Sequence, residues 1–123
     1  MTNFQFNENV KYLEDKDFDS NGNLLPPSDK SVVAMIAATW CGHCQTTKPV
    51  FQELANMMNG KNVYTAVILT DGPTEGEKKL GSRVGKMIPG FRGFPTIVKF
   101  VNGKYDSTYN GPRKVDSLSE FCE

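Results

Sequence analysis

Two continuous apolar runs, VVAMIAA at 32–38 and VYTAVIL at 63–69, constrain the fold more than any other feature of the chain. Both consist largely of β-branched and small residues, and both are far shorter than the roughly 20 residues that a membrane-spanning helix needs. A strand without polar alternation has no solvent-facing side, which is typical of a sheet with helices on both faces. Both runs are therefore predicted to be buried strands of one sheet.

The segment between the two runs has the spacing of a helix, from about Cys41 to Met58. Pro49 lies inside this helix and lacks the N–H that would close one turn, so a kink is expected there. The NGKN sequence at 59–62 is a helix stop signal. Apolar residues recur at i, i+3, i+4 and i+7 and form the stripe of a helix that lies on a core: Phe51, Leu54, Ala55 and Met58.

The second half of the chain predicts a hairpin and another helix. TIVKFV at 96–101 runs into Asn102-Gly103, a strong hairpin signal, and then into KYDSTY at 104–109, so these two strands should pair antiparallel. TEGE at 74–77 fits the capping box that begins a helix. That helix is expected to continue to Pro89-Gly90 and, because it contains several glycines, to be the softest element.

The remaining segments complete an alternating pattern of strands and helices. VKYL at 10–13 is expected to be a first strand, and LPPSDK at 25–30 an ordered turn. Val115, Leu118 and Cys122 indicate a short closing helix after Gly111-Pro112. The predicted order is β-α-β-α-β-α-β-β-α. This alternation indicates the α/β class, with a mixed central sheet flanked by helices on both faces, in a single domain over 1–123.

Composition excludes several classes of partner. The 14 basic and 14 acidic residues balance, so no overall field attracts nucleic acid or an anionic membrane surface. The N-terminal MTNFQFNENV lacks the features of a signal peptide, and FCE at the other end is no retention signal. We therefore expect a monomer in the cytoplasm that binds neither nucleic acid nor membrane, with an oxidising compartment as the less favoured alternative.

The stretch TWCGHCQ at 39–45 carries the candidate chemistry, because a CxxC pair opens a helix directly after a buried strand. A helix N-terminus has unpaired N–H groups and partial positive charge, which favour a thiolate at Cys41. Cys44 lies one turn further on, close enough to form a bridge and deeper in the helix. We expect an exposed Cys41 to exchange disulfides and a sheltered Cys44 to resolve the mixed disulfide. His43 beside the thiolate favours the reduced form, which makes the disulfide a stronger oxidant.

Other uses of the cysteine pair fit less well. A structural zinc site needs about four ligands, and this motif supplies two. A c-type haem site needs a histidine directly after the second cysteine, where Gln45 stands instead. No metal and no cofactor are therefore expected. The third cysteine, Cys122, stands near a fraying end, and a dimer linked through it would be an artefact.

With the strand, the CGHC sequence and Pro49 in place, the chain resembles the thioredoxin superfamily. It is most similar to a single catalytic domain of the protein disulfide isomerases. The resemblance covers roughly residues 9–122. The matching motifs are WCGHC at 40–44, Pro49 five residues beyond the second cysteine, RGFPTIVKFVNGK at 92–104 and YNGPR at 109–113.

The resemblance implies roles that spacing alone does not supply. Pro95 corresponds to the family's cis-proline, which faces the dithiol and keeps metals out. The backbone around Phe94 and Thr96 would pair with a substrate strand. Trp40 and Gly42 belong to the same implied substrate surface. Arg113 stands where disulfide isomerases carry a mobile arginine that swings toward the second cysteine and lowers its pKa.

One position departs from the family pattern. Six residues before the first cysteine, the family keeps a buried Asp or Glu that relays the proton of the second cysteine. Here that position is Met35, and the run at 63–69 contains no lysine to partner such an acid. Resolution by Cys44 is expected to be slow unless water or Arg113 compensates.

The sequence thus predicts a thiol–disulfide oxidoreductase that acts on protein thiols and disulfides and leans toward oxidation or isomerisation. It needs a redox partner whose identity the residues do not reveal. Two alternatives remain. One is a reductase of the thioredoxin type, and the other is a peptide-binding module whose dithiol is vestigial.

Overall fold

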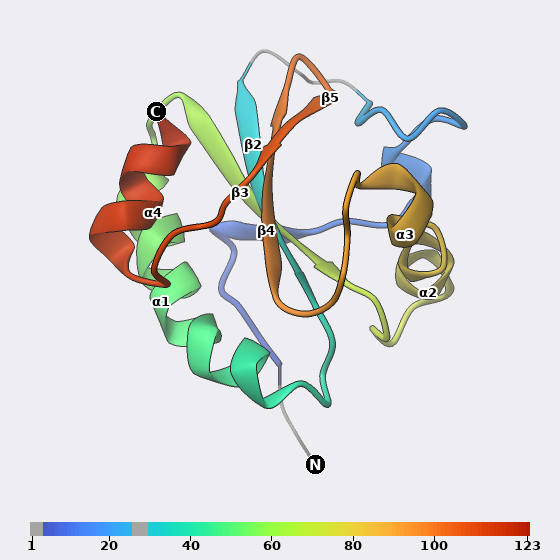
Figure 1. Ribbon diagram of the computed structural model, residues 1–123, viewed down its shortest axis with the longest axis horizontal. Helices are drawn as coiled ribbons and strands as arrows, with labels where there is room; N and C mark the ends of the chain where they lie inside the picture. The colour runs from blue at the N-terminus through green and yellow to red at the C-terminus, as the bar shows by residue number, and fades with distance from the viewer. Residues whose placement is uncertain (1–3, 26–29) are drawn as a thin grey trace.

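The computed structural model describes residues 4–25 and 30–123, which form one five-stranded sheet with helices on both faces (Figure 1). The α/β class, the mixed sheet and the central place of the two apolar runs are confirmed. In chain order the elements are β1 (Val10–Tyr12), the 3-10 turn η1 (Asp15–Asp17), β2 (Ser31–Ala37), α1 (Gly42–Met58), β3 (Val63–Leu69), α2 (Glu75–Gly81), α3 (Val84–Met87), β4 (Thr96–Val101), β5 (Lys104–Thr108) and α4 (Val115–Cys122).

The strand order is β1-β3-β2-β4-β5, so the two apolar runs lie at the centre of the sheet. β1 and β2 both pair parallel with β3, whereas β4 pairs antiparallel with β2 and with β5. In the parallel register Ala37 stands beside Leu69, which brings the chain ends that follow β2 and β3 together at one edge. The candidate site forms at this edge.

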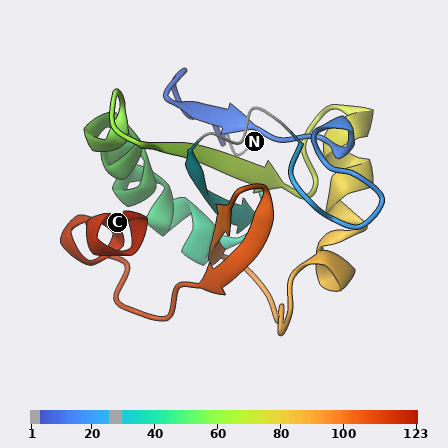
Figure 2. The same ribbon diagram turned by 90° about the horizontal axis from the view of Figure 1, so that it is seen from above.

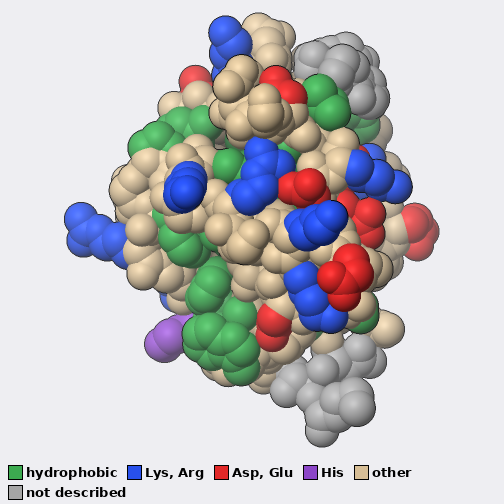
Figure 3. Space-filling view, turned by 90° about the vertical axis from the view of Figure 1, so that its right-hand side faces the viewer, with side chains coloured by type: hydrophobic (Ala, Val, Ile, Leu, Met, Phe, Trp, Pro, Cys, Tyr) green, Lys and Arg blue, Asp and Glu red, His purple; other side chains and the backbone are tan. Residues whose placement is uncertain are grey.

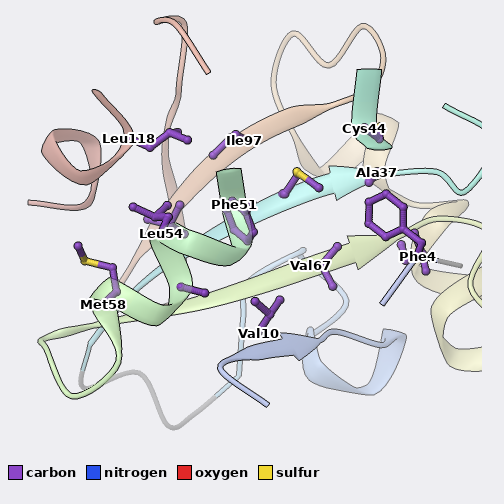
Figure 4. Packing of buried hydrophobic residues seen from close by; sticks show 14 of the residues in the cluster. Phe4, Val10, Ala37, Cys44, Phe51, Leu54, Met58, Val67, Ile97 and Leu118 are labelled. Carbon is purple, nitrogen blue, oxygen red and sulfur yellow. The ribbon is translucent and has the colours of Figure 1, made fainter. Parts of the chain in front are cut away.

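Each face of the sheet packs against its own helices. Figure 1 and Figure 2 show α1 and α4 on one side and α2 and α3 on the other. Alternate residues of β2 divide between the two cores: Val33, Met35 and Ala37 face α1, while Ala34 and Ile36 belong to the second cluster. Figure 4 shows Phe51, Leu54 and Cys44 of α1 pointing into the first core. Burial on both faces explains the lack of polar alternation in these strands.

Local signals in the sequence operate as expected at two boundaries. Thr74 caps α2, because its hydroxyl accepts the Glu77 N–H while the Glu77 carboxylate accepts the Thr74 N–H. In the β4–β5 hairpin, Asn102 and Gly103 have φ angles of 53° and 81°. This left-handed conformation matches the right-handed twist of the flanking strands and is why an Asn-Gly pair occurs there.

Two expectations about the helices were wrong. The predicted helix from Thr74 to Pro89 is divided into α2 and α3, and the chain bends at Ser82 and Arg83. Arg83 donates hydrogen bonds to the Asp15 carboxylate (2.7 Å) and to the Asp19 carbonyl (2.6 Å), so tertiary contacts hold the bend. The helix implied between the first two strands is only the short η1 turn within the described residues.

Other expectations have separate outcomes. α1 continues through Pro49, and the kink there stays a prediction. The expected turn at 25–30 falls mainly on residues 26–29, outside the described residues.

Cys122 does not lie at a fraying end: it is only 7% exposed and packs with Leu118 in the first core, because α4 docks onto α1. In the described part of the chain, no helix is both long and apolar enough to span a membrane.

Candidate active site

The two cysteines meet at the start of α1, where the chain leaves the central strand β2. Cys41 is the N-cap of α1 and has an extended backbone (φ −84°, ψ 115°). Its sulfur accepts a hydrogen bond from the Cys44 backbone N–H at 3.1 Å. Its own N–H donates to the Ala38 carbonyl at 3.2 Å, which closes the turn between strand and helix. The Cys41 sulfur thus occupies the position in which an N-cap satisfies a free helix donor.

Both thiols are covered, which corrects the expectation of an exposed Cys41. Cys41 is 6% exposed and Cys44 is 0% exposed, and both are free thiols in the first hydrophobic core. As the N-cap, Cys41 turns its side chain back over the first helical turn, so its sulfur does not project outward. The difference between the two cysteines is one of degree, since only Cys41 retains any accessible surface.

Burial gives Cys44 a strong preference for its protonated form. Loss of solvent, followed by the hydrogen bond with Cys41, raises the pKa of Cys44 to about 12. The backbone of Ala38 and the positive charge of Arg113 act in the opposite direction and lower it. In the reduced protein Cys44 therefore keeps its proton, which it must lose before it can attack a mixed disulfide.

No acidic side chain lies beside the buried Cys44 among the described residues. Met35 is 0% exposed and occupies the same core as both cysteines. The buried polar residues of the described chain are Thr47, Thr65 and Glu77. Glu77 caps α2 on the opposite face of the sheet and cannot receive a proton from Cys44. Within the described core, Met35 therefore leaves Cys44 without a carboxylate that could accept its proton.

The loop before β4 forms a second wall of the site. The Phe94–Pro95 peptide bond is cis, as the resemblance implied, and Thr96 follows as the first residue of β4. The Thr96 hydroxyl donates to the Gly93 carbonyl at 2.5 Å. Trp40 packs edge-to-face on Phe94 with ring centroids 5.6 Å apart, so the loop contacts the segment that carries Cys41.

Trp40 and His43 both face solvent beside the dithiol. Trp40 is 71% exposed although one edge of its ring is held by Phe94. His43 is exposed on the first turn of α1, and Figure 3 shows the single histidine next to a group of hydrophobic side chains. Gly42 lies between the cysteines, and a Cβ at this position would meet nothing within 4 Å. Space alone does not require this glycine.

Arg113 lies in the segment between β5 and α4. The Tyr109 hydroxyl donates to the Pro112 carbonyl and closes this segment into a loop. Arg113 is exposed, and its positive charge acts to lower the pKa of the buried Cys44. The Arg113 guanidinium thus acts on Cys44 through its charge. Within the described chain, no hydrogen bond joins the guanidinium to either cysteine.

One contact at the site has no counterpart in the sequence interpretation. The Asp71 carboxylate accepts hydrogen bonds from the backbone N–H and the hydroxyl of Thr39, at 2.9 and 2.5 Å. Asp71 follows β3 and Thr39 follows β2, and the ends of adjacent parallel strands meet at one edge. Polar residues two positions beyond the ends of two buried strands were the signal that could have indicated this contact. Among the described residues, no cluster of three His, Cys, Asp or Glu side chains forms a metal site.

Comparison with known proteins identifies the family. The family model described as Thioredoxin matches residues 9–123. The chain belongs to the thioredoxin family. A thioredoxin-like protein of Invertebrate iridescent virus 6 is 41% identical, over 80% of each chain. The protein disulfide-isomerase erp38 of Neurospora crassa is 36% identical, over 80% of this thioredoxin-family chain and 25% of its own length. A protein disulfide isomerase-like protein of Oryza sativa is 33% identical, over 96% of this chain and 22% of its own length.

Solved structures agree on the fold. Human ERp44 superimposes with a TM-score of 0.73 at 20% identity, covering 98% of this chain and 29% of the other. The J-Trx1 fragment of ERdj5 gives a TM-score of 0.64 at 23% identity, covering 92% of this chain and 49% of the other. The chain therefore spans four-fifths of the viral relative but a quarter or less of the disulfide isomerases named above. Family membership and the adjacent cysteine pair together support thiol–disulfide oxidoreductase chemistry in general.

Proposed function

We propose that this thioredoxin-family protein oxidises or isomerises disulfides of protein substrates through Cys41 and Cys44. The observation that carries the proposal is the hydrogen bond from the Cys44 N–H to the Cys41 sulfur, at the N-terminus of α1 and beside the exposed His43. Contacts that stabilise the reduced Cys41 sulfur lower the stability of the disulfide relative to the dithiol. A disulfide of this kind is a good oxidant.

The chemistry requires two exchanges. In oxidation, a substrate thiolate attacks the Cys41 sulfur of the Cys41–Cys44 disulfide, and the Cys44 thiolate leaves and takes up a proton. A second substrate thiolate then attacks the substrate sulfur of the mixed disulfide, which releases Cys41 as a thiolate and leaves the substrate oxidised. The two electrons remain on the enzyme dithiol, so a disulfide such as oxidised glutathione must restore the bridge.

Isomerisation uses the same groups without net oxidation. The Cys41 thiolate attacks a substrate disulfide and forms a mixed disulfide, and a different substrate thiolate then displaces Cys41. Escape from an unproductive mixed disulfide requires attack by Cys44, which must first lose its proton. In the described core, no carboxylate near Met35 can accept that proton. Slow resolution therefore gives substrates more time to rearrange, which favours isomerisation over reduction.

The deciding experiment is the reduction potential of the Cys41–Cys44 pair. The protein is equilibrated with mixtures of reduced and oxidised glutathione, and the single tryptophan, Trp40, reports the redox state by fluorescence. A value near about −180 mV, as in protein disulfide isomerase, agrees with the proposal. A value near about −270 mV, as in thioredoxin, would instead identify a reductase.

Two variants sharpen this measurement. His43→Ser should make the potential more negative, by about 30 mV for each tenfold loss of the preference for the dithiol. The control is Glu120→Gln, a change at an exposed residue of α4. A control at Gln45, closer to His43, is avoided because the Gln45 amide donates a hydrogen bond to the Thr39 carbonyl. Cys41→Ser tests the alternative of a peptide-binding module, because a pure binder would retain its partner while an enzyme would lose turnover.

A further inference from the structure

A polar groove of about 750 Å³ opens beside the cis-proline loop, where Pro95 and Thr96 line it. Its lining includes the start of β4 and three residues of β5: Tyr105, Ser107 and Thr108. Two connecting segments complete the lining: Pro89, Gly90 and Arg92 come from the segment before β4, and Tyr109, Asn110, Gly111 and Arg113 from the loop after β5. Figure 2 shows these two connecting segments on either side of the β4–β5 hairpin. The volume lies in the range that holds several residues of a bound peptide or a drug-sized ligand.

The groove carries positive charge in a chain that is neutral overall. Arg92 and Arg113 both line the groove, one from each connecting segment, and of the described residues that line it none is acidic. Neither guanidinium forms an ion pair within the described part of the chain. The nearest acid along β5 is Asp106, which does not line the groove and accepts a hydrogen bond from the Ser107 hydroxyl. Both cations are thus available to an anionic ligand.

Neighbouring contacts anchor the backbone segments that carry both arginines before any ligand arrives. In the sequence, Arg92 stands between Phe91 and Phe94. The centroids of these two rings lie 5.6 Å apart, and both rings contact the second core. The Arg113 loop is closed by the hydrogen bond from Tyr109 to the Pro112 carbonyl. The Tyr109 ring also packs on Phe121 of α4 at 5.3 Å. Anchored backbones reduce the ordering cost that a ligand must overcome.

The groove and the dithiol share a boundary. Pro95 and Thr96 line the groove, while Phe94, directly before them, contacts Trp40 beside Cys41. A polypeptide that places a disulfide at Cys41 and passes along the cis-proline loop therefore enters the groove with the residues that flank its cysteine.

We propose that Arg92 and Arg113 make this groove a docking site for an acidic segment of the substrate polypeptide, next to the disulfide that reacts. The proposal rests on the oxidoreductase function proposed above and names the substrate class that it prefers. Guanidinium groups bind carboxylates through paired N–H···O bonds, which adds directional recognition to simple attraction. Arg92 is then a specificity-determining residue outside the dithiol.

The test compares three disulfide peptides that differ only in residues flanking one cysteine, which are Glu, Gln or Lys. The wild-type protein should process the Glu peptide with the highest kcat/KM and the Lys peptide with the lowest. Arg92→Gln should lower kcat/KM for the Glu peptide about two- to five-fold, as expected for an exposed ion pair, and leave the Gln peptide unchanged. Lys104→Gln, an exposed lysine on β5 that does not line the groove, is the matched control and should change neither.

Salt provides an independent readout. The preference for the Glu peptide should shrink as ionic strength rises from about 0.01 M to about 1 M, since screening shortens the reach of charges from roughly 30 Å to roughly 3 Å. A preference that persists unchanged in high salt would contradict recognition by the two guanidinium groups. Glutathione disulfide serves as a small anionic substrate: if Arg92→Gln slows only its reaction and no peptide shows a preference, the claim of a polypeptide ligand is overturned.

A binding measurement separates failure of this inference from failure of the proposed function. The same peptides, with serine in place of cysteine, are titrated onto the protein and followed by chemical-shift changes, which do not require turnover. Tighter binding of the Glu peptide that Arg92→Gln removes would support the groove even if no disulfide were exchanged. Equal binding of the Glu and Gln peptides would overturn the inference, whether or not the protein turns over disulfides.

Discussion

Asp71 holds Thr39 through both oxygens of its carboxylate, one bonded to the backbone N–H at 2.9 Å and the other to the hydroxyl at 2.5 Å. From the other side, the Gln45 amide of α1 donates to the Thr39 carbonyl at 2.9 Å. Thr39 is therefore fixed to both β3 and α1, one residue before Trp40 and two before Cys41. The reacting cysteine is placed by a contact between strand ends as well as by its own helix.

Asp71→Ala should weaken catalysis more than it weakens the fold. Loss of the two hydrogen bonds at this partly exposed site should lower the free energy of unfolding by about 1 kcal/mol. We expect the rate of disulfide turnover to fall several-fold because the Trp40–Cys41 segment loses its anchor. Urea unfolding and turnover of a neutral disulfide peptide measure the two effects. Glu120→Gln, an exposed acid on α4, should alter neither, and an Asp71→Ala variant with full activity would contradict the positioning role.

Met35→Glu should accelerate release of mixed disulfides at the expense of stability. A carboxylate at this fully buried position can accept the Cys44 proton, which the protein as it stands holds tightly. Burial of an ionisable group without a partner should lower the free energy of unfolding by roughly 3 kcal/mol. The lifetime of a trapped mixed disulfide is measured by acid quenching. Met35→Leu is the control, and an equally long lifetime in the Glu variant would show that proton removal does not limit resolution.

The reduced protein should lose stability at alkaline pH. Burial raises the pKa of Cys44 to about 12 and that of Cys122 to about 11, from the ordinary value of 9.0. Above pH 9 these thiols ionise in the unfolded chain but remain protonated in the fold. The unfolded state then binds fewer protons, and the free energy of unfolding falls as pH rises through this window, by up to about 1.4 kcal/mol per pH unit for each thiol.

Urea unfolding of reduced protein at several pH values from neutral to about pH 10.5 checks this slope. Lysines and tyrosines also titrate there, so the comparison is with Cys122→Ala, which retains all of them. The variant should show a shallower decline above pH 9. Parallel curves for the two proteins would mean that Cys122 ionises equally in the folded and unfolded chain.

Two glycines of the α2–α3 region should respond in opposite directions to alanine. A Cβ at Gly85 in α3 meets nothing within 4 Å, so Gly85→Ala should raise the free energy of unfolding by about 0.5–1 kcal/mol through better helix propensity. A Cβ at Gly81 would collide with the Thr70 carbonyl oxygen, and Gly81→Ala should lower it by about 1–3 kcal/mol. Thermal unfolding of both variants measures the effects, and stabilisation by both would show that α2 can move away from Thr70.

The signals that the sequence carried correctly are short-range ones. Unbroken apolar runs predicted β2 and β3, Thr74 predicted the start of α2, and Asn102-Gly103 predicted the hairpin. The CxxC pair at a strand–helix junction predicted two neighbouring thiols, and the resemblance to thioredoxins supplied the cis peptide bond at Pro95. Apart from the cis bond, which only the resemblance implied, each of these features depends on backbone preferences or spacing within a few residues.

The tertiary structure decided the features that join distant segments. The chain bends between α2 and α3 because Arg83 donates hydrogen bonds to Asp15 and Asp19. The residues near Arg83 in the sequence do not predict these two distant partners. The same holds for the burial of Cys41 and Cys122, for the Asp71–Thr39 contact and for the groove between Arg92 and Arg113. The sequence determined which elements form and which pair of residues can react. The packing of the sheet determined how far that pair is shielded from water and which charges face it, because both depend on residues brought together from remote parts of the chain.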